Sequence, residues 1–116
     1  MIKMNNEFTF PSQECPNVDV YNEWYEGFNA DLNFAVDHDT QNHWTIHLGF
    51  DGPLSRLDIW QGSVSTSDNR NFVVENLSWD GDYSDGDMFT LAMLGYFDGT
   101  RPKMISATFD DQDICS

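Results

Sequence analysis

Three tryptophans are the residues of this sequence that most need a chemical explanation. Residues 57–60 alternate strictly, so that if the leucine and the isoleucine enter a core, Asp58 and Trp60 point outward. Trp24 and Trp79 each adjoin a polar stretch, and alternation alone leaves them either as half-buried rim residues or as members of one exposed row. A flat row of indoles suits the apolar C–H face of a sugar ring, while neighbouring amides and carboxylates can bind its hydroxyl groups.

The charge of the chain narrows the choice of partner. The sequence has 20 Asp and Glu against 5 Lys and Arg, a formal net charge of −15. Nucleic acids and anionic membrane surfaces both require a basic patch, so we expect neither as a partner. No stretch approaches the roughly 20 apolar residues of a membrane span. A neutral ligand, a cation or a cationic partner remains.

Neither a catalytic site nor a metal site stands out. His43 and His47 share one face of a predicted strand but lie about 13 Å apart by strand rise, too far to share one ion. Residues 80–82 and 85–87 resemble a calcium loop, but the second Asp-Gly comes one residue late and Leu91 stands at the glutamate position, so we expect turns. Carboxylates are so numerous that no pair is marked as the acid and nucleophile of a glycosidase. We therefore expect no enzyme, no cofactor and no metal.

Two cysteines, Cys15 and Cys115, stand near opposite ends of the chain. If the ends of the domain meet, the two can form a disulfide, which is typical of a secreted protein. The alternative is a pair of free thiols in a cytosolic protein. We expect the disulfide, and with it a secreted location.

The hydrophobic pattern is that of strands and shows no helical period. Turn signals recur about every 10 residues, which predicts an all-β sandwich or barrel. The predicted strands cover residues 18–24, 28–36, 43–50, 57–62, 72–79, 88–97 and 103–109.

Several details of the domain follow from the same pattern. Alternation places Trp44 in the core, and it places Ile105 on the inner face of the last strand. Gly27 and Phe28 mark a turn or bulge. We expect residues 63–70 to be the end of a strand that leads into a turn. An acidic tail follows the last strand. Residues 1–14 are predicted to be a linker or flexible arm, and residues 15–116 the folded domain.

The order of these residues resembles a family 2 carbohydrate-binding module, in the branch that binds crystalline polysaccharide. The resemblance runs from Cys15 to Cys115 and includes all four tryptophans. Its motifs are Trp-Tyr-Glu-Gly-Phe-Asn-Ala at 24–30, His-Trp-Thr-Ile-His-Leu at 43–48, Glu-Asn-Leu-Ser-Trp-Asp-Gly at 75–81, and Gly-Tyr-Phe-Asp-Gly at 95–99 with Pro102.

The resemblance implies an antiparallel β-sandwich of about nine strands, immunoglobulin-like or jelly-roll-like, with a disulfide between Cys15 and Cys115. It also implies a coplanar surface strip of Trp24, Trp60 and Trp79, with Trp44 in the core. The polar residues at the family's binding positions are Asn22, Asp31, Asp58 and Thr90.

Two of the corresponding positions differ from the family. Asp58 and Thr90 stand where the family often has glutamine, and a carboxylate can accept but not donate a hydrogen bond. In the xylan-binding branch an arginine at the position of Gly27 holds the tryptophan perpendicular to the surface. Because glycine has no side chain to do this, the resemblance implies that Trp24 lies flat.

The function implied is non-catalytic: a monomeric module that anchors a secreted protein to insoluble cellulose, as part of a polysaccharide-degrading enzyme or as an accessory to one. The chain is more acidic than typical members, which adds a cationic polymer such as chitosan to the candidate ligands. An alternative is a chitin-binding structural or matrix protein whose acidic surface binds calcium or a cationic partner.

Overall fold

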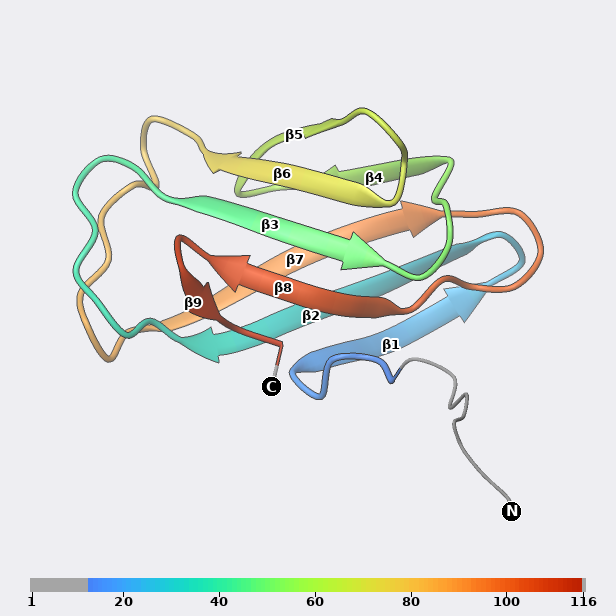
Figure 1. Cartoon of the computed structure of the whole chain (residues 1–116), viewed down its shortest axis with the longest axis horizontal. Helices are drawn as coiled ribbons and strands as arrows, with labels where there is room; N and C mark the ends of the chain where they lie inside the picture. Colours follow the sequence, from blue (N-terminus) through green and yellow to red (C-terminus); the bar gives the residue numbers. More distant parts are fainter. Residues whose placement is uncertain (1–12, 116) are drawn as a thin grey trace, which may run out of the picture.

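Two antiparallel sheets packed face to face form the structure, a computed structural model that describes residues 13–115 (Figure 1). The first sheet has the order β1-β2-β7-β4 and the second the order β5-β6-β3-β8-β9. The strands are β1 (Val18–Trp24), β2 (Gly27–Ala35), β3 (Thr45–Phe50), β4 (Arg56–Ile59), β5 (Gly62–Thr66), β6 (Asn71–Asn76), β7 (Met88–Tyr96), β8 (Met104–Phe109) and β9 (Gln112–Asp113). The predicted all-β sandwich of about nine strands is confirmed. Between residues 13 and 115 there is no helix long and apolar enough to cross a membrane.

The longest ladder in the sandwich joins β2 to β7. It pairs every residue of both strands, from Gly27 opposite Tyr96 to Ala35 opposite Met88, without a shift in register. Since side chains alternate along a strand, this register separates an inner, apolar set from an outer, polar set. The inner set is buried and comprises Phe28, Ala30, Leu32, Phe34, Phe89, Leu91 and Met93.

Trp44 lies at the centre of the core and is 0% exposed, as its strand alternation predicts. Its ring meets Phe89 edge-on, with the ring centroids 5.1 Å apart. A buried indole needs a partner for its N–H, and Trp44 Nε1 donates to the carbonyl of Asp80 at 2.6 Å. The backbone N–H of Trp44 donates to the side-chain oxygen of Asn76 at 2.8 Å. The core residue thus holds the connection that leads from β6 to β7.

The prediction of one strand over residues 57–62 is wrong, because the chain changes sheets there. β4 ends at Ile59, and Gly62 begins β5 in the opposite sheet. A side chain at Gly62 would lie 2.5 Å from the carbonyl of Glu75, so only glycine allows this close crossing. The expectation for residues 63–70 is also wrong in part, since β5 pairs along β6 as far as Thr66.

Three further strand predictions are corrected. The strand predicted over 72–79 ends at Asn76, whose side chain turns to accept the Trp44 N–H. Ile105 is exposed rather than inward, because β8 carries one extra residue there: Gly49 pairs with Ser106 but Phe50 pairs with Met104. Part of the predicted acidic tail forms the short strand β9.

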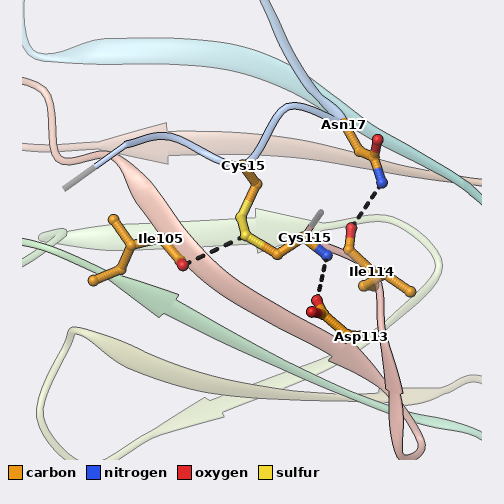
Figure 2. The surroundings of a disulfide bond; sticks show 6 residues. All are labelled: Cys15, Asn17, Ile105, Asp113, Ile114 and Cys115. Atoms are coloured by element: carbon orange, nitrogen blue, oxygen red, sulfur yellow. Dashed lines mark hydrogen bonds between the residues drawn. A yellow bond between two sulfur atoms is a disulfide. The ribbon is translucent and has the colours of Figure 1, made fainter.

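A disulfide between Cys15 and Cys115 joins the two ends of the domain (Figure 2), and the free-thiol alternative is wrong. Their Cα atoms are 4.7 Å apart. Asn17 Nδ2 donates to the carbonyl of Ile114 at 2.9 Å, and the Cys115 N–H donates to Asp113 Oδ1 at 2.9 Å. The C-terminal segment is thereby held beside the start of β1 (Figure 1).

Most of the predicted arm, residues 1–14, lies outside the described residues. Glu14 is described, and its carboxylate receives two hydrogen bonds from the Arg101 guanidinium, at 2.6 and 3.1 Å. Arg101 also reaches Glu23 at 3.3 Å. The boundary between arm and domain remains a prediction.

Replacing both Cys15 and Cys115 by serine should destabilise the domain strongly. The cross-link spans 100 residues, so its loss should lower the free energy of unfolding by up to about 4–5 kcal/mol in the chain-entropy account. Urea unfolding of the double variant beside the oxidised wild type measures this difference. Reduced wild type is the control and should unfold like the variant. A double variant as stable as oxidised wild type would contradict the prediction.

His38 lies between two carboxylates in the connection from β2 to β3. Its Nδ1 is 2.7 Å from Asp37 Oδ1, and its Nε2 is 2.6 Å from Asp110 Oδ2. The hydrogen bonds to Asp37 and then to Asp110 favour the imidazolium and raise the pKa of His38 above its ordinary value of 6.5. The other oxygen of Asp110 accepts the Thr45 N–H at 3.0 Å, so His38 links this connection to the turn between β8 and β9.

This arrangement should make part of the stability depend on pH. Because the pKa of His38 is raised in the folded state, its contribution is fully present below pH 6.5 and is lost as the pH rises through the folded-state pKa. The difference in free energy of unfolding between wild type and His38→Gln should therefore shrink as the pH rises above 6.5. Urea titrations across this range measure the difference. A difference that does not change with pH would rule out this role.

Candidate functional site

The outer face of the β1-β2-β7-β4 sheet is the surface on which most of the predicted site residues meet. The ladder between β2 and β7 directs alternate residues outward, and β1 and β4 continue its register at either side. The outward residues therefore fall into rows that run across the strands. Three of these rows contain Trp24, Asn22 with Asp58, and Asp31.

The first row contains Trp24 and Gly27, with Tyr96 and Arg56 beyond them. A Cβ atom at Gly27 would fall 2.4 Å from the indole nitrogen of Trp24, so the ring lies directly on the glycine backbone. The prediction of a turn at Gly27 is wrong: Gly27 begins β2, and the turn before it contains Glu26, with φ 66°. The glycine provides room for the indole rather than a bend in the chain.

A shallow hollow of about 500 Å³ adjoins this row at the end of the sheet. Trp24 and Arg56 line it together with Tyr25, Glu26, Ser55, Tyr96, Phe97 and Asp98. It widens the face beyond Trp24 without enclosing a pocket.

Asn22 and Asp58 lie in the second row, separated by Asn29 and Leu94. Asp58 Oδ1 accepts a hydrogen bond from Arg56 Nε at 3.0 Å. This hydrogen bond, together with the negative charge of Asp58, raises the pKa of Arg56, so the guanidinium stays charged. The Asp58 carboxylate cannot donate a hydrogen bond, but the guanidinium of the neighbouring Arg56 can donate to a ligand in its place.

The third row contains Asp19 and Asp31, then Ala92. Trp60 directly follows the last paired residue of β4, Ile59, which lies opposite Met93; continued by one residue, this register puts Trp60 beside Ala92. Trp60 is 59% exposed, as its alternation predicts.

Gln61 holds this end of β4 in place, although the sequence did not single it out. Its side-chain Nε2 donates to the carbonyl of Thr90 at 2.5 Å, and its Oε1 accepts the Ala92 N–H at 3.3 Å. The amide therefore makes the backbone contacts that β4 would have made had it continued. The only sign of this role in the sequence is that Gln61 directly follows the exposed Trp60.

Thr90 lies one row further and donates its hydroxyl to Asn33 Oδ1 at 2.6 Å. Asn33 is a second residue that sequence reasoning missed. The Thr90 hydroxyl already donates its hydrogen to Asn33. It can therefore accept a hydrogen bond from a ligand but not donate one.

Trp79 belongs to the connection between β6 and β7 and is 71% exposed. The turn that carries it is joined to the residue after Trp60, since the Leu77 N–H donates to the Gln61 carbonyl at 3.3 Å. Asp80 closes the same turn by donating its N–H to Leu77 at 3.0 Å. Buried Trp44 holds this turn from below through the carbonyl of Asp80.

The rows also give the separation of the first two exposed indoles. Trp24 and Trp60 are three strands apart across the sheet and four residues apart along it, which places their Cα atoms roughly 20 Å apart on a diagonal. Trp24 is 40% exposed. The two exposed indoles therefore lie at opposite edges of the sheet.

Three of the four aspartates in the segments that resemble a calcium loop accept hydrogen bonds within the protein. Asp82 accepts the Asn42 N–H at 2.6 Å, Asp87 accepts the Ser84 N–H at 2.8 Å, and Asp80 accepts the Tyr83 hydroxyl at 3.1 Å. No group of three or more His, Cys, Asp and Glu side chains in residues 13–115 is arranged to hold a metal ion.

Comparison with known proteins identifies relatives of this domain. A family model described as a cellulose-binding domain matches residues 15–114. Endoglucanase A from Thermobispora bispora is 28% identical over 90 residues, which are 77% of this chain and 20% of the endoglucanase. The chain thus spans about a fifth of the length of that curated relative.

Solved structures share the fold at low sequence identity. Chitinase ChiA74 from Bacillus thuringiensis has a TM-score of 0.61 and 20% identity, over 79% of this chain and 14% of the chitinase. The chitin-binding domain of Chi18aC from Streptomyces coelicolor has a TM-score of 0.57 and 16% identity, over 78% of this chain and 86% of that domain. The chitin-binding domain of a chitinase from Pyrococcus furiosus has a TM-score of 0.52 and 16% identity, over 89% and 99% of the two chains.

The contact between Trp24 and Gly27 predicts a specific effect of Gly27→Ala. The added methyl group would overlap the indole, a side-chain group that can move, so the fold should persist while the ring shifts. One of the four tryptophan indole N–H signals in a ¹H–¹⁵N NMR spectrum should therefore move, and the backbone signals of the core should not. The control is Gly52→Ala, whose methyl group would meet only Pro102 at an ordinary 3.5 Å. An unchanged set of indole signals in Gly27→Ala would refute the contact.

Proposed function

Because the chain belongs to the family of cellulose-binding domains, matched over residues 15–114, we propose that it anchors a larger protein to insoluble cellulose. The domain is a non-catalytic polysaccharide-binding module. The proposal beyond that concerns the polymer and the residues that hold it. Trp24, Trp60 and Trp79 stack on the sugar rings, and Asn22, Asp31, Asp58 and Thr90 bind hydroxyl groups between them.

The observation that most supports this proposal is the exposure of three of the four indoles. Trp24, Trp60 and Trp79 are 40%, 59% and 71% exposed, whereas Trp44 is completely buried. Leaving such large apolar rings in water is unfavourable unless a partner covers them. A pyranose ring offers an apolar face of similar width, so stacking removes both surfaces from water.

The support beneath these rings suits a flat, rigid ligand. Trp24 rests on the backbone of Gly27, and the chain beside Trp60 is fixed through the two hydrogen bonds of Gln61. Rings that are already ordered lose little conformational entropy when they bind. A flat polymer surface therefore fits this face better than a single twisted chain.

The polar groups between the rings are mostly acceptors. Asp58 accepts a hydrogen bond from Arg56, and the Asp31 carboxylate can accept one from a ligand. The Thr90 hydroxyl is already used as a donor, and Arg56 and Asn22 supply donors. Sugar hydroxyls both donate and accept, so this mixture can bind the edges of rings whose faces lie on the indoles.

The setting of the whole protein is part of the proposal. The chain spans about a fifth of its endoglucanase relative, which supports a module that accompanies a polysaccharide-degrading enzyme. A disulfide that closes the domain is typical of oxidising surroundings, so we propose secretion. We propose that the module acts as a monomer.

Chitin is the second candidate polymer, as in the predicted alternative of a chitin-binding matrix protein. It is favoured by the fold shared with two chitin-binding domains, from Streptomyces coelicolor and Pyrococcus furiosus. The acidic surface supports a cationic partner more than calcium, because three of the four loop aspartates already accept hydrogen bonds from Asn42, Tyr83 and Ser84.

Trp60→Ala should weaken retention on microcrystalline cellulose while leaving the fold intact. The ring lies on the surface, and by analogy with other aromatic stacking its loss should cost about 1–3 kcal/mol, roughly 5- to 150-fold in affinity. A depletion assay measures the fraction bound, and circular dichroism verifies the fold.

Ile105→Ala is the control for this variant. Ile105 is also an exposed apolar residue, but it lies on β8 in the opposite sheet, so cellulose retention should not change. If Trp60→Ala binds as well as wild type, the tryptophan face is not the binding surface.

A further inference from the structure

Two aspartates face each other directly on the tryptophan-bearing sheet. Asp19 of β1 and Asp31 of β2 are register partners, and both lie on the outer face in the same row as Trp60. Directly opposed like charges destabilise a strand pair. The fold therefore keeps an arrangement that an asparagine at either position would relieve.

No protein cation neutralises this pair within the described residues. Neither carboxylate has a hydrogen bond or an ion pair there, whereas Arg56 is paired with Asp58 and Arg101 with Glu14 and Glu23. Arg56 itself lies two strands across the sheet and four residues along it from Asp31, too far to reach. The negative charge of this pair thus has no protein cation beside it within the described residues.

The aspartate pair lies close to Trp60, one of the tryptophans proposed to stack on sugar rings. Asp31 and Trp60 are separated by one strand and by Ala92, whose methyl group is small, so roughly 10 Å of open sheet lies between carboxylate and indole. This is within the reach of one sugar unit and its neighbour. The exposed indole is an independent sign of a sugar ligand. The two carboxylates favour a sugar that carries a positive charge.

We propose that Asp19 and Asp31 bind the ammonium group of an amino sugar, and that this face recognises β-1,4-linked polymers that contain glucosamine, such as partially deacetylated chitin. This inference rests on the proposed function and names a ligand class for the same face. An ammonium group has three donors and can bridge two carboxylates, which removes their mutual repulsion. A cation on a stacked ring also gains from the indole face.

The charge of the whole chain favours the same ligand. A net charge of −15 attracts a polycation over a long range and speeds its association. Long-range attraction alone would not depend on particular residues, whereas a bridge between Asp19 and Asp31 does. The test must therefore separate the two.

The experiment compares wild type, Asp19→Asn and Asp31→Asn in depletion assays on cellulose, fully acetylated chitin and partially deacetylated chitin, at a pH that protonates the polymer amines. Wild type should prefer the deacetylated polymer, and each variant should lose roughly three- to tenfold of that binding. Asp19 is outside the residues proposed to bind sugar hydroxyls, so Asp19→Asn should bind cellulose and acetylated chitin as wild type does. Asp31→Asn should lose more binding to the deacetylated polymer than to the neutral ones. The preference should fall between about 0.1 and about 1 M NaCl, as the Debye length shortens from about 10 to about 3 Å.

Asp111→Asn is the matched control. It removes the same charge from an exposed turn between β8 and β9, on the other sheet, and should leave the preference unchanged. An equal loss in Asp111→Asn, or no loss in Asp31→Asn, would overturn the site and leave only the attraction of the net charge. Thermal unfolding verifies the fold, and Asp31→Asn should raise the melting temperature because the repulsion is gone.

Two outcomes keep this inference distinct from the proposed function. If wild type binds all three polymers equally, the amino-sugar site is refuted while the polysaccharide-binding face stands. If wild type binds none of them, the proposed function itself is refuted.

Discussion

The uninterrupted register between β2 and β7 is the constraint on which the rest of the structure depends. It buries one face of both strands among the core phenylalanines and directs the other face outward. A slip by one residue would exchange the two faces, at the cost of exposing the core. Since β1 and β4 take their own registers from these strands, the same ladder also places Trp24, Asp58 and Trp60.

The remaining tryptophan, Trp79, lies in the connection that follows β6, and this connection is joined to the crossing that follows β4. Gln61 fills the end of the first sheet with its side chain and accepts the Leu77 N–H with its carbonyl, so one residue joins the positions of Trp60 and Trp79. Buried Trp44 fixes the same turn from the core side. Polar groups thus fix both the chain beside Trp60 and the turn that carries Trp79.

Local alternation predicted much of this fold because each strand is half-buried, and a half-buried strand shows its inner face in its own sequence. Trp44 and Trp60 were placed correctly on that ground alone. The errors came where the chain departs from regular pairing. The bulge at Ile105 reverses the alternation, and β5 is rich in hydroxyl residues without an apolar face.

The features of the site that the sequence could not predict depend on pairing between distant residues. Gly27 resembled a turn residue, and only the contact with Trp24 explains it as a space for the ring. The contacts of Gln61 and Asn33 with Thr90 likewise appear only once β4, β2 and β7 are side by side. Charge on an edge strand protects against unwanted pairing, and this accounts for Asp19 on β1. It does not account for Asp31, because β2 lies inside the sheet, paired on both sides. A charge kept inside the sheet, opposite another and facing the tryptophans, is explained by a cationic ligand better than by the needs of the fold.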